Sequence, residues 1–215
     1  MANYSDASYS TLVEALKEEL GDAIPSPSLI PRWIRFAEVW CERNLDLDIY
    51  DGEEQYSIAG GSSNVDLPED FGEFRLFYVV STGGTAYAVD LGSRMRIVDY
   101  DDDDTGVPEV CWVDVQNRVL QFRPAASESF TGYLFYKRVL APLSYTNDSN
   151  DLLRNYFDLL FYRTLIHAAP YLYEDDRVRV WGTMLNNLVN EVEMHQWRRR
   201  NQHRFKELRT TLRLP

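Results

Sequence analysis

The sequence predicts a mixed α+β fold: an α-helical bundle of four main helices, an antiparallel β-rich insertion between the second and third helices, and an extended C-terminal tail. Three observations lead to this prediction. Apolar residues recur at helical spacing near both ends of the chain. Between them, from about residue 53 to 139, short runs rich in Val, Tyr and Phe alternate with turn sequences. The closing stretch is strongly basic.

These boundaries give three predicted parts. Residues 1–50 and 145–197 form the helical bundle, 51–144 form the β-rich insertion, and 198–215 form a basic C-terminal docking tail. The flanking helices are expected to pack together, because each carries an apolar face that must be buried against another element. The insertion is then expected to project from the bundle.

The first helix is predicted over "YSTLVEALKEELG". Leu12, Leu16 and Leu20 repeat on one face, and Gly21 is suited to end the helix. Thr11 and Glu14 fit a capping box, in which the side chain of each residue accepts a hydrogen bond from the backbone amide of the other.

The second helix is predicted to begin at Ser28 as its cap, with Pro31 tolerated in the first turn. The third is expected over "LLRNYFDLLFYRTLIHAA", with Pro170 ending or kinking it, and its many apolar residues predict burial on more than one side. The fourth is expected to start with the acids "EDD" at 174–176 and to run to about His195 or beyond.

Composition limits the class of protein. Hydrophobic residues make up 45% of the chain, enough for a sizeable core. No apolar run approaches the length of a membrane span, and the polar N-terminus does not read as a signal peptide, so we expect no membrane association and a cytosol-like compartment. Cys41 and Cys111 are too few and too far apart for a disulfide framework, and both are expected to be buried, reduced thiols.

Charge is unevenly distributed. The formal net charge is −12, yet residues 198–215 hold seven Lys/Arg and one acid, a net +6, which leaves −18 on the rest. An acidic body repels nucleic-acid phosphates, whereas a basic tail is attracted to an acidic surface.

The tail also contains apolar residues between its charges, a mixture suited to a groove on an acidic protein. Two other interpretations stay open: an arm that binds nucleic-acid phosphates, and a solvated, frayed terminus. The predicted docking residues are Arg198, Arg199, Arg200, Arg204, Phe205, Lys206, Leu208, Arg209, Leu212, Arg213 and Leu214.

Candidate metal sites are weak. In "DYDDDDTG", Asp101, Asp103 and Thr105 match the start of a calcium loop, but Trp112 stands where the loop needs a bidentate glutamate. We therefore interpret the Asp101–Asp104 loop as a solvated acidic turn. Glu191 and His195 share a helical face without a third ligand nearby, which indicates an exposed pair.

Sequence signatures of catalysis are also missing. His167 reads as a hydrogen-bonded core histidine, Ser62 and Ser63 lack a nucleophile elbow, and no phosphate-binding glycine motif occurs. The sequence therefore predicts no catalytic residues, no cofactor and no metal. The alternative, a wall-degrading or nuclease component, would depend on Asp101, Asp103 or Glu191.

Four stretches in a fixed order resemble a known family. They are "FAEVWCERNL", then "VDLPEDF", then "VPEVCWVDVQNRVLQFRPAASESFTGYLFYKRVLAPLS", then "LLRNYFDLLFYRTLIHAAPYLYEDDRVRVW". In this layout the chain resembles the head-to-tail adaptor (connector) proteins of tailed bacteriophages, of the short-tailed type. The resemblance extends from "SLIPRWIRFAEVWCERNLDL" to "MHQWRRR".

The resemblance implies a structural virion protein at the head-tail junction, assembled in the host cytoplasm. It implies a homo-oligomeric ring, usually a dodecamer, that lies beneath the portal protein ring, extends the DNA channel and provides a platform for tail nozzle or fibre proteins. Genomic DNA would pass without sequence-specific binding, and residues 198–215 would hold the ring to the portal. The runners-up are another tail-completion or tail-tube component and a nucleic-acid-binding module that uses the Arg-rich tail.

Overall fold

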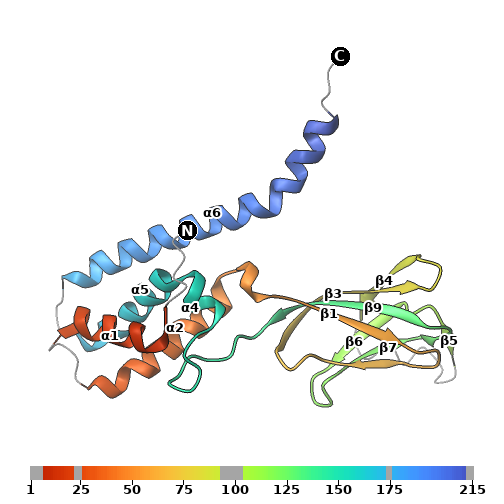
Figure 1. The fold of residues 1–215 in the computed structure, drawn as a ribbon, viewed down its shortest axis with the longest axis horizontal. Helices are drawn as coiled ribbons and strands as arrows, with labels where there is room; N and C mark the ends of the chain where they lie inside the picture. Colours follow the sequence, from red (N-terminus) through yellow and green to blue (C-terminus); the bar gives the residue numbers. More distant parts are fainter. Residues whose placement is uncertain (1–6, 22–25, 93–103, 173–175, 212–215) are drawn as a thin grey trace. The chain divides into compact units, whose positions relative to one another are not determined.

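The computed structural model describes residues 7–21, 26–92, 104–172 and 176–211, with side chains described as far as Asn201. The chain forms two compact units (Figure 1). The helical unit comprises Met1–Ile49 and Leu140–Pro215, and the β unit comprises Tyr50–Val139.

The helical unit is built from both ends of the chain. Its buried residues lie at the helical spacing seen in the sequence, so the helices pack through their apolar faces. Its helices are α1 (Tyr9–Leu20), α2 (Ile30–Asn44), α4 (Asp151–Asn155), α5 (Phe157–Ala168) and α6 (Arg177–Thr211), with short 3₁₀ turns at Pro27–Leu29, Asp48–Tyr50 and Ala169–Tyr171.

Helix caps differ from those predicted. The Ser8 side chain caps α1 by accepting a hydrogen bond from the Thr11 amide, and Thr11 accepts one from the Ser8 amide, so Thr11 is the second half of the box. Ser26 accepts a hydrogen bond from the Ser28 amide and caps the 3₁₀ turn that leads into α2. The predicted capping box of Thr11 with Glu14 and the predicted cap Ser28 were therefore wrong. In each case an earlier serine, Ser8 or Ser26, accepts the hydrogen bond from the backbone amide.

A buried carboxylate joins α2 to the segment that precedes α4. Glu38 is 5% exposed. Its Oε1 accepts hydrogen bonds from the Leu143 amide at 3.0 Å and from Asn150 Nδ2 at 3.1 Å, while Arg35 approaches Oε2 at 3.5 Å. Burial raises the pKa of Glu38, and these partners oppose the rise. Glu38 thus provides a hydrogen-bonded polar contact inside an otherwise apolar interface.

The β unit is a seven-stranded sheet that curves until it is nearly barrel-shaped, with the order β1-β9-β3-β4-β6-β7-β2. A two-stranded sheet of β5 and β8 accompanies it. The strands are β1 (Asp51–Ile58), β2 (Asn64–Asp66), β3 (Phe71–Ser81), β4 (Ala86–Leu91), β5 (Thr105–Gly106), β6 (Val110–Asp114), β7 (Val119–Arg123), β8 (Ala125–Ala126) and β9 (Phe130–Arg138).

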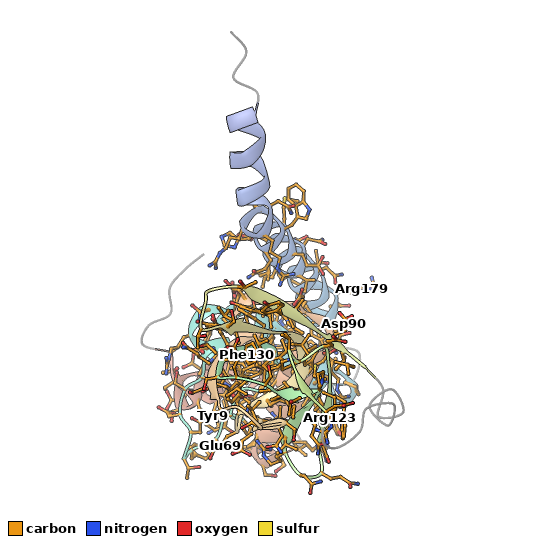
Figure 2. All side chains as sticks on the ribbon, turned by 90° about the vertical axis from the view of Figure 1, so that its right-hand side faces the viewer. Tyr9, Glu69, Asp90, Arg123, Phe130 and Arg179 are labelled. Atoms are coloured by element: carbon orange, nitrogen blue, oxygen red, sulfur yellow. The ribbon has the colours of Figure 1, made fainter. Side chains whose placement is uncertain are left out.

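Alternate residues of these strands fill the interior of the β unit. Phe77, Phe122 and Leu134 are fully buried there. Phe130, 3% exposed, lies among the core side chains, whereas Glu69 lies at the surface (Figure 2). Gly132 permits this packing, because a Cβ at this position would lie 2.8 Å from Ile58 Cδ1. The β unit therefore has a hydrophobic core of its own.

The predicted fold class was wrong in its architecture. The β part is a large, nearly closed sheet and not an antiparallel insertion on a four-helix bundle, and the described residues form five α-helices. The sheet is also mixed, since β4 pairs with β6 in parallel. Parallel neighbours require a long connection, and residues 92–109 provide it. The predicted alternation was visible in the sequence, but it does not specify which strands pair.

Two helix predictions were wrong for local reasons. The expected helix from residue 152 is divided into α4 and α5 at Tyr156, whose φ of −141° and ψ of 44° leave the helical region. The expected extended tail is helical as far as Thr211. No glycine or proline occurs between residues 183 and 214, and Arg, Lys, Glu and Leu are good helix formers, so nothing in that stretch stops the helix.

Candidate partner-docking site on helix α6

Helix α6 carries the predicted docking residues from Arg198 to Arg209 and packs against the rest of the helical unit along one face. Trp181, Leu185 and Val192 are buried at helical spacing. At its first turns, Trp181 Nε1 donates a hydrogen bond to Glu19 Oε1 at 3.0 Å, and Arg177 donates to the Glu19 backbone carbonyl at 2.5 Å. The C-terminal turns extend past the other helices of this unit (Figure 1).

A second anchor lies where the basic segment begins. We call it the α6 clamp, formed by Asp46, Asp48, Tyr156, Gln196, Arg199 and Arg200.

The interior of the α6 clamp is a hydrogen-bond network around Gln196, which is 5% exposed. Its Nε2 donates to Asp48 Oδ1 at 3.0 Å and to the Tyr156 hydroxyl at 2.9 Å. Burial, assisted by the Asp48 carboxylate, raises the pKa of Tyr156 to about 12, so this hydroxyl stays protonated. This network also accounts for the break at Tyr156, because leaving the helical conformation allows its side chain to reach α6.

The outer part of the α6 clamp consists of two ion pairs. Arg199 donates to Asp48 Oδ2, and Arg200 donates to Asp46 Oδ2 and to the Asp46 backbone carbonyl. All four side chains are partly exposed, so each pair alone stabilises little. Both pairs join this turn of α6 to the segment that follows α2.

Beside the α6 clamp lies a surface groove of about 250 Å³. Leu45, Leu47 and Val192 contribute apolar wall, and Trp197, 57% exposed, stands at its edge. An exposed tryptophan next to an apolar groove is typical of a protein-contact surface.

The structure separates the predicted docking residues into three groups. Arg198 is exposed, with Nη2 3.4 Å from Met194 Sδ, while Arg199 and Arg200 contact acids of their own unit. The backbone of α6 carries Arg204, Phe205, Lys206, Leu208 and Arg209, whose side chains lie outside the described part. Leu212, Arg213 and Leu214 lie outside the described residues.

Sequence reasoning missed the acidic half of the α6 clamp. Asp46 and Asp48 follow the end of α2 in "LDLD", and Gln196 and Tyr156 gave no signal of their own. The signal that could have found the acids is charge complementarity: a short acidic stretch in the loop after one helix and a basic stretch late in another.

The other candidate residues form no site in the described part of the chain. There, no three His, Cys, Asp or Glu side chains are placed to hold a metal ion. Asp101 and Asp103 lie outside the described residues. His167 is half-buried beside Phe36, with ring centroids 5.7 Å apart, and burial lowers its pKa. Among the described helices, none has the length and hydropathy to cross a bilayer.

Both cysteines are buried, free thiols, as predicted. Burial raises the pKa of Cys41 and of Cys111 to about 12. They belong to the two cores, since Cys41 lies on the buried face of α2 and Cys111 lies in β6.

The fold is thus a helical unit with an anchored basic helix, joined to a β unit. A family model described as SU10 adaptor protein matches residues 7–210, and the chain belongs to this family. A search of curated proteins finds no match. The family is one of structural phage adaptors, and the chain is accordingly a virion component.

Proposed function

We propose that this protein is a non-enzymatic head-to-tail adaptor that forms a ring under the portal, extends the DNA channel and carries the tail attachment platform. The supporting observations are the family match and the anchored α6 helix. In this proposal the protein assembles in the host cytoplasm and occupies the head-tail junction of the virion. The tail nozzle or fibre proteins and a dodecameric ring are the further partners.

The observation that carries the proposal is the continuity of α6. The helix is held by the buried residues Trp181, Leu185 and Val192, passes through the α6 clamp and continues to Thr211 without interruption. A helix that is fixed at its base presents its last turns in a defined direction, which reduces the ordering cost of docking. The basic segment 198–215 is therefore suited to dock on an acidic groove of the portal.

The α6 clamp refines which residues dock. Arg199 and Arg200 already contact Asp48 and Asp46, so their first role is to position the segment. The docking charges are then Arg198 and those beyond Asn201, together with the apolar residues between them. The portal groove in this proposal is acidic at its rim and apolar at its floor.

The α6 clamp also favours docking on a protein over binding of nucleic acid. Two of the three consecutive arginines lie against carboxylates, which lowers the positive potential available for phosphates at Arg198–Arg200. The strongly acidic rest of the chain would repel DNA, which suits a channel wall that DNA must pass without adhering.

Binding of the portal ring by truncated chains tests the proposal. A cut after Asn201 removes residues 202–215 and keeps Arg198 and every residue of the α6 clamp, whereas a cut after Trp197 would remove Arg198, Arg199 and Arg200 as well. We expect the chain cut after Asn201 to keep the fold of the helical unit up to that residue and to lose at least about 100-fold in affinity, because avidity across a ring multiplies each lost contact.

Arg179→Ala is the matched control, since Arg179 is an exposed base on the anchored part of α6 (Figure 2). It should bind the portal ring as the full-length protein does. Unchanged binding by the chain cut after Asn201 would contradict the docking role of the segment.

A further inference from the structure

One flank of the helical unit combines aromatic rings with arginines that have no acid beside them. Helices α2 and α5 lie side by side, and the guanidinium of Arg163 on α5 lies over the Trp40 ring of α2, 4.2 Å from its centroid (Figure 1). On α2, Phe36 and Arg43 are exposed and lie two helical turns apart, on the same side as Trp40. We call this surface the α2–α5 face, formed by Phe36, Trp40, Arg43 and Arg163.

Arg163 is the central residue of the α2–α5 face and lacks a counter-charge. In the described part of the chain, no carboxylate lies within ion-pair distance of Arg163 or Arg43. The Nε atom of Arg163 is buried there without a hydrogen-bond acceptor, and Nε2 of His167, one turn along α5, is likewise buried and unpaired. Because a buried donor or cation is costly without a partner, these groups indicate a site that an acid from outside this unit completes.

The acids of α2 and α5 lie on other sides of these helices. Glu38 and Glu42 are one turn apart on the flank of α2 that contacts the Leu143 amide. Asp158 lies in the first turn of α5, where its carboxylate accepts a hydrogen bond from the Leu159 amide. The α2–α5 face is therefore basic, although the whole chain is acidic.

The gaps in the described chain adjoin other parts of the helical unit. Residues 1–6 precede α1, whose first residue lies beside Tyr145. In sequence, residues 22–25 and 173–175 adjoin the start of α2 and the turn after α5, at least two helical turns from Trp40 or Arg163. The α2–α5 face is thus made of described residues only.

The complementary charge is present in the same chain. Residues 99–104 read "DYDDDD", so the Asp101–Asp104 loop and the two residues before it contain five Asp, one Tyr and no base. This run belongs to the β unit, which has 16 Asp/Glu and 7 Lys/Arg, a net charge of −9. Residues 93–103 lie outside the described residues, so the run is characterised by its sequence. Carboxylates pair well with guanidinium groups, and a tyrosine ring packs well on exposed aromatic rings.

Charge also decides which surfaces can meet. Two α2–α5 faces would bring arginines against arginines, and two acidic loops would bring aspartates against aspartates. A loop against a face is instead a heterologous contact, the kind that closes a ring of identical subunits.

We propose that the Asp101–Asp104 loop of one copy of this chain binds the α2–α5 face of a second copy. Its carboxylates pair with Arg43 and Arg163. Tyr100 packs against the exposed ring of Phe36, which is 49% exposed. Around a ring, many such weak contacts add to one another through avidity.

This proposal rests on the proposed ring, because only there does each copy need two different contact surfaces. It adds which surfaces meet. Binding of the loop sequence to the face requires no portal, so a failure of portal binding and a failure of this contact are observed separately.

A peptide with the loop sequence tests the proposal on the full-length chain. The probe is fluorescein-labelled IVDYDDDD, which corresponds to residues 97–104, titrated into dilute protein at low salt. We expect a Kd of about 1 mM or tighter, with NMR shifts centred on the Trp40 indole and the Arg163 Nε–H. The same peptide with Asn in place of every Asp should bind at least about tenfold more weakly, and added salt should weaken the parent peptide.

Arg43→Glu reverses an exposed charge of the α2–α5 face without touching the core. It should weaken peptide binding at least about tenfold, and Arg163→Gln, which removes the central charge, should do the same. Arg179→Glu is the matched control, since Arg179 is an exposed base on α6 and lies outside the face. It should bind the peptide as the parent does, and both Arg43→Glu and Arg179→Glu should unfold at the parental temperature.

A chain with Asp101→Asn, Asp102→Asn and Asp103→Asn together distinguishes the source of the loop. If a second copy fills the face, the dilute parent and this variant should bind the peptide equally. Peptide binding by the variant alone would show that the loop covers the face of its own chain, which contradicts the proposal.

Three other results would overturn it: no peptide binding at about 1 mM, equal binding by the Asn peptide, or unchanged binding by Arg43→Glu. Tighter binding of an oligothymidylate of the same charge would instead assign the α2–α5 face to nucleic acid.

Discussion

Replacing Glu38 by alanine should destabilise the helical unit by about 2–4 kcal/mol. The change deprives the buried Leu143 amide of its acceptor, a loss that typically costs about 1–3 kcal/mol. The Asn150 side-chain amide also donates to the Ala141 carbonyl at 3.1 Å and so loses only one of its two acceptors. Its contribution to the lost stability is therefore smaller. Arg35, whose side chain is 44% exposed, adds little. The small cavity left by the removed side chain lowers the stability further.

Glu38→Gln is the informative companion, because it keeps an acceptor oxygen and removes the charge. Burial raises the pKa of Glu38, so the folded unit binds this proton more tightly than the unfolded chain does. That stabilisation is fully present below the ordinary glutamate value of 4.5 and is lost as pH rises through the folded pKa. Relative to the parent, Glu38→Gln should therefore become more stable as pH is raised from 4 to 7.

Urea unfolding followed by tryptophan fluorescence measures this effect in the full chain. In a Trp112→Phe background every remaining tryptophan lies in the helical unit, so the signal reports on that unit alone. A Glu38→Ala loss below about 0.5 kcal/mol, or a Glu38→Gln difference that does not change with pH, would refute the reasoning.

Three further outcomes follow from the same contacts. Gln196→Leu should cost about 1–3 kcal/mol in urea unfolding of the helical unit, because Asp48 and Tyr156 lose a shared buried donor; an unchanged midpoint would contradict this role. Phe77→Ala should cost about 3–5 kcal/mol in the β unit, where the ring is fully buried, and near-parental thermal melting would contradict it. A thiol reagent at pH 8 should label Cys41 and Cys111 only on unfolding, because burial raises their pKa to about 12, and rapid labelling of the native protein would contradict this.

The sequence predicted elements better than their arrangement. The helices over Tyr9–Leu20 and Ile30–Asn44 were visible because one face of each is apolar at a regular spacing. The pairing of β4 with β6 was not, because alternation marks a strand but does not say which strand lies beside it. The extended tail was wrong because its charges and apolar residues were interpreted as a docking tail, although its residues also have high helix propensity.

The docking segment was predicted from its charge, its interleaved apolar residues and the family resemblance, whereas its anchor was not predicted. The α6 clamp joins Asp48 to Gln196 and Arg199, which are far apart in sequence, and a single sequence gives no measure of such distances. The role of Tyr156 was hidden for the same reason: its place in an apolar run resembled that of its neighbours, yet its hydroxyl lies in the α6 clamp.

The most direct test of the adaptor role is the native mass of the portal ring mixed with this protein, full-length or cut after Asn201. The account predicts a complex with one copy of the full-length chain per portal subunit, and no complex with the shortened chain. A portal ring that stays intact and takes up none of the full-length protein would contradict the account.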